Sequence, residues 1–365
     1  MDTTLIEEIH ERDGKFVLAI TGGGVSALAE LLSVPGASNT VLSAFVPYHA
    51  DELSQFIGGI PDQSCSSKTA RALAMAAFQR ARSLETEEPV FGLGCTAALA
   101  TTRERRGDDR CYIAIQSSGS SSEVSVNFDK ERRTRSEEEK LCTSLLLDFI
   151  ARSLGIDHKA SDHLRTTDEF TRNEIVANKS WQSLLSGEIK STLIDESPEL
   201  IFPGAFNPLH QGHFEMIRYA EEVTGKTASL EISIFNVDKP PLDFIEMQSR
   251  QDALEARPLV FTNAPTFVEK CRIFQGATFI VGTDTLSRIA ETKYYDESTD
   301  QRDSALKEMQ SSGTKFLVFG RRSENEFIGF DNLTLPDALT DMCIKVPEEH
   351  FSMDISSTEI RASQN

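Results

Sequence analysis

The chain has 365 residues, which predicts two domains, each long enough to bury its own core. Its formal net charge of −20 argues against sequence-independent binding of DNA or RNA, because a uniformly acidic surface repels nucleic acid. No apolar run approaches the roughly 20 residues that span a membrane, and the acidic N-terminus is unlike a secretory signal or a transit peptide. The six cysteines form no C-x-x-C pair, so we expect reduced thiols in a cytoplasmic protein without structural zinc.

The first half of the chain alternates patterns that are typical of strands and helices. Strands are predicted at 15–20, 90–94, 111–116 and 123–128, and helices after Gly24, over 69–85 and over 134–155. The last of these helices carries Leu141, Leu145 and Phe149 every four residues on one side, and Gly155 marks its end. The alternation predicts an α/β domain over residues 1–158, followed by a more polar connecting segment, 159–197, with some helix.

The second half repeats this α/β pattern. Strands are predicted at 199–203, 229–236, 278–282, 315–320 and 343–346, with a helix from His213 to Thr224 that ends at Gly225. These elements predict a Rossmann-like, doubly wound parallel sheet over residues 198–365, whose ligands bind beyond the carboxyl ends of the strands. The fold class predicted for the chain is therefore α/β, with two domains.

The loop after the first of these strands reads Gly204-Ala205-Phe206-Asn207-Pro208-Leu209-His210-Gln211-Gly212-His213. Gly204 and Gly212 allow the backbone to approach a ligand closely. His210 and His213 lie at the start of a helix, whose free N–H groups and partial positive charge suit a phosphate. Two imidazoles there can donate hydrogen bonds to phosphoryl oxygens as charge builds in the transition state, without a covalent step. The alternative is a plain strand–loop–helix turn whose histidines cap the helix or bind a metal ion.

A second motif stands near the end of the sequence, Ile355-Ser356-Ser357-Thr358-Glu359-Ile360-Arg361. Ser356 and Glu359 fit a capping box at the start of a last helix. The same turn offers hydroxyl and N–H groups, and Arg361 adds a cation that can bind the β- and γ-phosphates of a leaving pyrophosphate. The two interpretations are compatible, because one turn can cap a helix and bind phosphate.

Together the two motifs resemble the nucleotidylyltransferase superfamily, and in particular the nicotinamide/nicotinate mononucleotide adenylyltransferases. Gly282-Thr283-Asp284, Lys239-Pro240-Pro241, the run 250–254 and Phe319-Gly320-Arg321 also match parts of that family's pattern. The resemblance covers about residues 199–363. It implies transfer of AMP from ATP to nicotinamide or nicotinate mononucleotide, which forms NAD or its deamido form and releases pyrophosphate.

The same resemblance assigns roles to single residues. It implies that His210, His213 and Arg361 are catalytic, with the two histidines stabilising the transition state at the α-phosphate. The nucleotide-binding residues that it implies are Gly204, Ala205, Phe206, Gly212, Lys239, Gly282, Asp284, Arg321, Ser357 and Thr358. We expect Mg²⁺ to bridge the phosphates, bound mainly through substrate oxygens and water, so no dedicated metal site on the protein is expected.

Residues 14–155 resemble a second family, the C-terminal domain of the competence-damage protein CinA, which includes nicotinamide mononucleotide deamidases. The matching runs are Thr21-Gly22-Gly23, Pro35-Gly36-Ala37-Ser38 and Val46-Pro47-Tyr48. Ser38 and Tyr48 occupy two of that family's active-site positions, but Leu53 stands where the family has a lysine. Because a serine without a base is a poor nucleophile at neutral pH, we expect a domain that has lost amidase activity and serves structure, assembly or ligand sensing.

The glycine-rich run Thr21-Gly22-Gly23-Gly24 has two interpretations. It can hold an anion at the start of a helix, or it is a plain glycine-rich turn, which is the interpretation we favour. Gly22-x-Gly24-x-x-Ala27 also mimics a dinucleotide-binding fingerprint. That match is weak, since no acidic residue follows a second strand at the spacing that a ribose contact needs.

The leading hypothesis is therefore an adenylyltransferase that binds ATP and a phosphorylated small-molecule acceptor. Within the same class, phosphopantetheine or another phosphorylated acceptor, or CTP as the donor, stay open as alternatives. Two rivals come from other classes, an amidohydrolase that acts through Ser38 and a non-catalytic nucleotide-binding scaffold. Both family resemblances also imply a homo-oligomer, although the sequence shows no interface patch.

Overall fold

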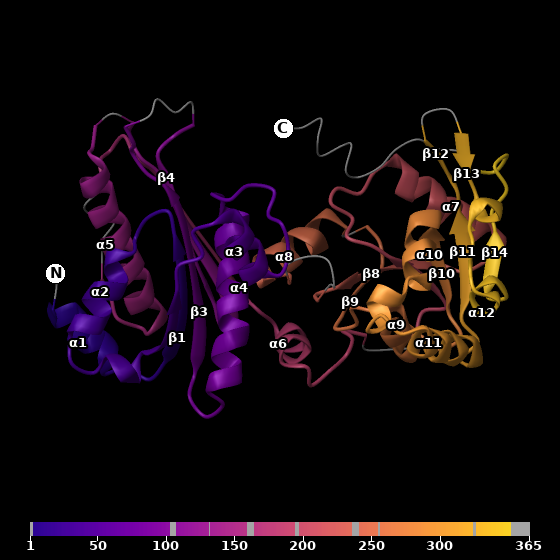
Figure 1. Cartoon of the computed structure of the whole chain (residues 1–365), viewed down its shortest axis with the longest axis horizontal. Coiled ribbons are helices and arrows are strands. Elements are labelled where there is room, and N and C mark those ends of the chain that lie inside the picture. Colours follow the sequence, from indigo (N-terminus) through magenta and orange to yellow (C-terminus); the bar gives the residue numbers. More distant parts are fainter. Residues whose placement is uncertain are drawn as a thin grey trace. The chain divides into compact units, whose positions relative to one another are not determined.

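A computed structural model describes residues 3–102, 107–130, 132–158, 164–193, 197–235, 241–254, 256–323 and 326–351. Within these ranges the chain forms two compact units (Figure 1). The first unit is drawn from residues 3–182 and 241–247, and the second from residues 183–235 and 248–351. The segment 241–247 therefore packs in the first unit, although in the sequence it lies between strands of the second. In the described part of the chain, every helix is too short or too polar to cross a bilayer.

The first unit is built on a six-stranded mixed sheet in the order β2-β1-β3-β4-β5-β6. Its strands are β1 (Lys15–Thr21), β2 (Val41–Phe45), β3 (Val90–Ala98), β4 (Arg110–Gln116), β5 (Ser120–Asn127) and β6 (Glu169–Val176). β1 is parallel to both of its neighbours, and the other pairs are antiparallel. The helices are α1 (Thr3–His10), α2 (Ser26–Ser33), α3 (Ala50–Ile57), α4 (Ser67–Leu84) and α5 (Arg135–Ser153), with a 3-10 turn at Ala37–Asn39.

Helices cover both faces of this sheet, because β1 is apolar on both sides. Phe16, Leu18 and Ile20 pack into one core with α1, α2 and α5. Val17 and Ala19 face a second core, which α3 and α4 complete. The first unit is therefore a three-layer α/β domain, which confirms the class predicted from the alternation of strand and helix patterns.

The close packing of α4 on the sheet depends on glycines in β3. A Cβ atom at Gly94 would lie 2.1 Å from the carbonyl oxygen of Ala70, and one at Gly92 would lie 2.1 Å from the carbonyl oxygen of Ala74. Both clashes are with helix backbone, which cannot move aside as the end of a side chain can. The two glycines therefore set the distance between helix and sheet in this unit.

The second unit is built on an all-parallel sheet in the order β14-β11-β10-β7-β8-β9. Its strands are β7 (Leu200–Pro203), β8 (Ala228–Ser233), β9 (Leu259–Thr262), β10 (Thr278–Gly282), β11 (Lys315–Phe319) and β14 (Cys343–Lys345). The chain runs outward from β7 to β9, returns to the centre at β10 and runs outward again to β14. This is the doubly wound order that the sequence predicted, and the strand order reverses between β7 and β10.

The connections of the second unit contain helices and one small hairpin. The helices are α7 (Gln211–Thr224), α9 (Phe267–Ile273), α10 (Thr283–Ala290), α11 (Thr299–Ser311) and α12 (Asp337–Thr340), with 3-10 turns at Thr292–Tyr295 and Phe330–Asn332. The hairpin pairs β12 (Arg321–Ser323) with β13 (Glu326–Ile328). Ile201, Phe279 and Phe316 belong to the main core, whereas α7 packs against β7, β8 and β10.

Two helices contain residues of both units. α6 (Lys179–Ser186) crosses the boundary at residue 182, and α8 (Phe244–Ala253) crosses it at residue 247. The segment 159–197, for which the sequence predicts a connecting stretch with some helix, also contains β6. This strand was missed because it is an edge strand that is exposed at nearly every position, so it shows no alternation of apolar and polar residues.

The glycines of β3 give a test of the packing of the first unit. We expect Gly94→Ala to lower its free energy of unfolding by about 2 kcal/mol or more, because the added methyl group overlaps the backbone of α4. Urea unfolding followed by the fluorescence of Trp181, the single tryptophan and only 4% exposed, measures this loss. Gly107→Ala is the control, since a Cβ atom there meets no atom of the described residues within 4 Å. Equal stability of the two variants would contradict this account.

Candidate functional site

The loop that joins β7 to α7 lies where the strand order of the second sheet reverses. Loops at such a point diverge to opposite faces of a parallel sheet and leave a crevice for a ligand. In this loop Phe206 adopts a positive φ of 46° and is only 3% exposed. Its ring folds back over Gly204, where a Cβ atom would lie 2.8 Å from the ring. Gly204 therefore permits the close approach of the Phe206 ring, and its role in binding a ligand stays a prediction.

His210 and His213 are brought together at the start of α7. Their ring centroids lie 3.7 Å apart, and the backbone N–H of His210 donates to Nδ1 of His213 over 3.2 Å. The rings of Phe202 and Phe206 meet the His213 ring edge-on at 5.6 and 5.3 Å. Since Nδ1 of His213 accepts a hydrogen bond, the proton of the neutral imidazole belongs on Nε2. His213 therefore has one defined donor, in an orientation that the surrounding rings fix.

Both histidines are held in the neutral form. Burial lowers the pKa of His213 to about 4, and the neighbouring His210 adds to this effect. Burial also lowers the pKa of His210. At neutral pH the pair therefore presents N–H dipoles and carries no positive charge.

The start of α7 also offers donors that the rest of the described chain does not use. His213 and Phe214 donate their backbone N–H groups to the carbonyl of His210, which leaves those of Gln211 and Gly212 at the open end of the helix. Nδ1 of His210 is buried and has no hydrogen-bond partner among the described residues. Unpaired donors at a helix start suit an anionic ligand such as a phosphate.

A second loop joins β10 to α10. It lies beside the β7–α7 loop, on the other side of the point where the strand order reverses. Gly282 ends β10 and precedes α10, and Asp284 lies in the first turn of that helix. The carboxylate of Asp284 pairs with the guanidinium of Arg321 at 3.0 Å, and both side chains are about half exposed. An exposed pair of this kind contributes about 1 kcal/mol or less, so a ligand can replace either partner at little cost. The structure thus brings together two residues that the sequence analysis assigned to nucleotide binding.

Other assigned residues lie outside the described part of the chain. These are Lys239, Ser357, Thr358 and Arg361, together with the capping-box residues Ser356 and Glu359. Their roles stay predictions. In the described ranges, no three side chains of His, Cys, Asp or Glu are grouped so that they could hold a metal ion.

In the first unit, the glycine-rich run at the end of β1 binds the carboxylate of Glu139, a side chain of the same chain. The carboxylate of Glu139 accepts the N–H groups of Gly24 at 2.8 Å and of Ser26 at 3.1 Å, and the Ser26 hydroxyl at 3.2 Å. Arg135 donates to the carbonyl of Gly22 at 3.1 Å. The start of α2 is therefore capped from α5, and its donors are not available to a free phosphate.

The amidase-like residues of the first unit do not form a reactive group. Ser38 lies exposed in the 3-10 turn, Tyr48 is 69% exposed, and neither has a side-chain hydrogen bond in the described chain. Leu53, at the position of the family's lysine, is 3% exposed and packs with Phe56 and Ile57. A lysine there would bring its ammonium group into an apolar core, so this position now serves packing.

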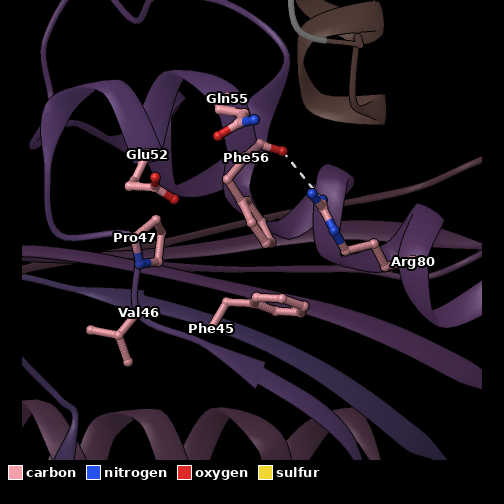
Figure 2. Close-up of a pocket in the computed structure, with 7 residues that line it drawn as sticks. All are labelled: Phe45, Val46, Pro47, Glu52, Gln55, Phe56 and Arg80. Atoms are coloured by element: carbon pink, nitrogen blue, oxygen red, sulfur yellow. Dashed lines mark hydrogen bonds between the residues drawn. The ribbon is translucent and has the colours of Figure 1, made fainter.

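A pocket of about 300 Å³ opens beyond the end of β2 (Figure 2). Phe45, Phe56 and Arg80 form its wall, and the guanidinium of Arg80 lies 3.9 Å from the centre of the Phe56 ring. One nitrogen of Arg80 donates to the carbonyls of Phe56 and Ala76, at 3.2 and 3.4 Å. Burial lowers the pKa of Arg80. The residues that line this pocket include Val46 and Pro47 of the amidase-like motif but not Ser38 or Tyr48.

Three residues around these sites were not singled out from the sequence. Phe202 packs on His213, Arg250 donates to the carbonyl of Ala205 at 2.6 Å, and Glu139 fills the glycine-rich loop. Of these three residues, only Arg250 could have been found from the sequence, because it lies in the run 250–254 that resembles the adenylyltransferase pattern. The other two act through contacts between distant parts of the sequence, which one sequence does not reveal.

The neutral state of His213 gives a direct test of this geometry. In an NMR titration of the imidazole, we expect a midpoint near 4 in the folded protein and near the ordinary value of about 6.5 in urea. Because protonation then favours the unfolded chain, the free energy of unfolding should fall as the pH drops from about 6.5 towards 4. The nitrogen shifts should place the proton on Nε2. A folded-state midpoint at or above 6.5 would show that the ring is not buried in this way.

Two solved structures match part of the chain. The competence/damage inducible protein CihA from Agrobacterium tumefaciens is 16% identical, with a TM-score of 0.34, over 42% of this chain and 94% of that chain. A protein of the CinA superfamily from Escherichia coli is 14% identical, with a TM-score of 0.30, over 42% of this chain and 84% of that chain.

The sequence matches one curated protein and one family model. A Schizosaccharomyces pombe protein, provisionally named a nicotinamide mononucleotide adenylyltransferase, is 29% identical over 123 residues, which cover 30% of this chain and 49% of that protein. The chain thus spans about half the length of this curated relative. Residues 201–363 match the family model described as cytidylyltransferase-like. The part of the chain with the doubly wound sheet and the histidine pair at the start of α7 is therefore similar to the cytidylyltransferase-like family.

Proposed function

We propose that residues 198–365 transfer a nucleoside monophosphate from an NTP to a phosphorylated acceptor. The leading case is AMP transfer from ATP to nicotinamide or nicotinate mononucleotide, with NAD or its deamido form and pyrophosphate as products. One observation carries this proposal, the pair of neutral histidines at the open start of α7, where buried Nδ1 of His210 has no partner among the described residues. The similarity to the provisionally named adenylyltransferase supports the choice of acceptor.

In this reaction a phosphate oxygen of the acceptor attacks the α-phosphorus of the NTP. A new P–O bond forms, the bond to the bridging oxygen of the β-phosphate breaks, and pyrophosphate leaves with that electron pair. Negative charge on the α-phosphate oxygens increases towards the transition state. The Nε2–H group of His213 and the N–H groups at the start of α7 would stabilise it, since preorganised donors in a partly buried site act most strongly where charge develops.

The remaining phosphates need cations from elsewhere in the chain. Lys239, Ser357, Thr358 and Arg361 would hold the triphosphate, by their positions in the two motifs. Asp284 and Arg321, which pair across the ends of β10 and β11, would separate to contact the nucleotides. An exchange of this kind is favourable when the guanidinium gains a phosphate, because such bonds are bidentate and charge-assisted.

Mg²⁺ fits this arrangement as an ion carried by the substrate. When bound, it would neutralise part of the negative charge of the phosphates. The described residues offer single carboxylates, such as that of Asp284, and not a group of ligands around one point. The residues of this chain would therefore orient the phosphates and leave most of the coordination of the ion to substrate oxygens and water.

We further propose that the first unit has no amidase activity. The base that would activate Ser38 is replaced by the buried Leu53, and Glu139 occupies the donors of the glycine-rich loop. A rival amidohydrolase function would need a nucleophile with a hydrogen-bonded base, and Ser38 has none among the described residues.

Pyrophosphate release by the purified full chain tests the proposed transfer. Reactions contain Mg²⁺, ATP or CTP, and one of three acceptors: nicotinamide mononucleotide, nicotinate mononucleotide or phosphopantetheine. We expect release with ATP and a pyridine mononucleotide, and a fall of ~10²–10³ in kcat for His213→Ala, because one aligned donor is lost. The exposed His49 gives the matched control, and His49→Ala should retain the full rate.

The same reactions decide between the alternatives. Pyrophosphate release with CTP as donor, or only with phosphopantetheine as acceptor, would change the assigned substrates. The proposed class of reaction would stay the same. Ammonia from nicotinamide mononucleotide, lost in Ser38→Ala, would favour the amidohydrolase. Full activity in His213→Ala would remove the histidine pair from the mechanism.

A further inference from the structure

The pocket beyond the end of β2 lies entirely in the first unit and has no role in the proposed transfer (Figure 2). Its volume of about 300 Å³ is at the lower end of the range for small-molecule sites. The walls come from the end of β2, from α3 and from α4, so segments far apart in the sequence form it together. A space of this size suits a ligand with a single ring and few substituents.

One wall of the pocket is aromatic and partly open to solvent. The rings of Phe45 and Phe56 have their centroids 5.1 Å apart and are inclined at 54°. Phe56 is 8% exposed, whereas Phe45 and Val46 remain 36% and 47% exposed. Pro47 lies next to them along the lining (Figure 2). Exposed apolar side chains that gather at a concave surface are typical of a binding site, whereas single ones are ordinary.

Arg80 of α4 supplies the positive charge of the pocket. Its guanidinium lies over the Phe56 ring, 3.9 Å from the ring centroid, and 5.5 Å from the centroid of Phe45. Its Nη1 group donates to the carbonyl oxygens of Phe56 and Ala76, and these contacts orient the guanidinium plane. Nε and Nη2, which form the other edge of the guanidinium, have no hydrogen-bond partner among the described residues. That edge is therefore available to a ligand.

Arg80 also lacks the carboxylate partner that comparable arginines have. Arg71, Arg133 and Arg152 are partly buried in the same unit, and each pairs with an aspartate or a glutamate. In the described part of the chain Arg80 forms no ion pair, and burial alone lowers its pKa. A partly buried guanidinium without a counter-ion costs stability, and an anionic ligand would remove that cost. An unpaired cation is informative in a chain whose net charge is −20, because carboxylates are abundant.

The rest of the lining narrows the class of anion. The free edge of a guanidinium carries two parallel N–H groups, which match the two oxygens of a carboxylate. Glu52 lines the pocket from α3 without pairing with Arg80, so its charge opposes a dianion such as phosphate more than a monoanion. Glu52 and Gln55 also offer acceptor oxygens to an N–H or O–H group of a ligand. The partly exposed phenylalanine rings favour a planar ring over a saturated one.

We propose that this pocket binds a small aromatic or heteroaromatic carboxylic acid. Nε and Nη2 of Arg80 hold the carboxylate, and the ring of the ligand packs on the wall formed by Phe45 and Phe56. The first unit is then a ligand-binding module whose site does not use Ser38 or Tyr48. This inference does not rest on the proposed nucleotidyl transfer, because every residue that carries it belongs to the first unit.

Binding of benzoate to the full chain, measured by calorimetry and by saturation-transfer NMR, tests this site. Two matched probes separate the parts of the recognition: benzamide keeps the ring without the charge, and cyclohexanecarboxylate keeps the charge without the aromatic ring. We expect benzamide to bind roughly tenfold to a hundredfold more weakly than benzoate, because the charge-assisted hydrogen bonds are lost. Cyclohexanecarboxylate should bind about twofold to tenfold more weakly, because the aromatic contact is lost.

Variants test whether the acid binds at Arg80. Arg80→Gln removes the charge, and Arg80→Lys keeps the charge but removes the two parallel donors. Both should lower the affinity for benzoate by roughly tenfold or more. Arg82→Gln is the matched control, because Arg82 lies in the same helix, 5.9 Å from the Phe78 ring, and is not part of the pocket lining. If Arg80→Gln fails to fold by circular dichroism, Arg80→Lys and the three probes with the wild-type chain still decide.

The outcomes also separate this inference from the proposed function. No saturation transfer to millimolar benzoate, equal binding of benzamide, or unchanged affinity in Arg80→Gln overturns the inference. Inorganic phosphate that binds more tightly than benzoate and displaces it overturns the assigned class of ligand. Loss of benzoate binding in His213→Ala would place the acid at the transferase site and overturn the inference, whereas retained binding supports it. A wild-type chain that transfers no nucleotide refutes the proposed function and leaves these binding measurements unaffected.

Discussion

The all-parallel second sheet can bind a ligand at its strand ends only where its strand order reverses, and β7 and β10 lie on the two sides of that point. This constraint places two short loops side by side. One ends in the start of α7 with His210 and His213, and the other in the start of α10 with Asp284. Both loops are short and begin on buried strands, so the sheet fixes their positions. The chemistry proposed for this domain needs little else from the protein, because nucleotidyl transfer depends on orientation and on aligned donors.

At the start of α7, burial determines the protonation state of the proposed histidine donors. Phe202 and Phe206 surround the His213 ring, lower its pKa to about 4 and leave Nδ1 to accept from the backbone of His210. In the first unit, similar groups serve a different purpose. The glycine-rich loop has the donors of an anion site, but Glu139 satisfies them, and Leu53 packs in an apolar core. The two units therefore differ in whether their donors at a helix start are left open for a ligand.

Sequence patterns predicted the helices, strands and motifs that are determined by residues close together in the sequence. The helix predicted over 134–155 is observed at Arg135–Ser153, because Thr134 and Glu137 form a capping box at its start. Most strands and the histidine motif were predicted for the same reason, since period and spacing are local, but β2, β9 and the hairpin β12–β13 were not predicted. β6 was missed because an exposed edge strand shows no alternation of apolar and polar residues. The membership of 241–247 in the first unit could not be predicted, because it depends on contacts between residues far apart in the sequence, such as Arg71 with Asp243. The triphosphate contacts stay predictions, because Lys239 and Arg361 lie outside the described residues.

The central claim is that this chain transfers a nucleotidyl group, and the fate of a label on the α-phosphorus of ATP tests it most directly. The full chain is incubated with Mg²⁺, labelled ATP and nicotinamide or nicotinate mononucleotide, and the products are separated. The account predicts that the label appears in a dinucleotide and that the pyrophosphate formed in equal amount is unlabelled. Label that stays in ATP with every acceptor, or that appears only in free AMP, would contradict it, because no bond to an acceptor would then have formed.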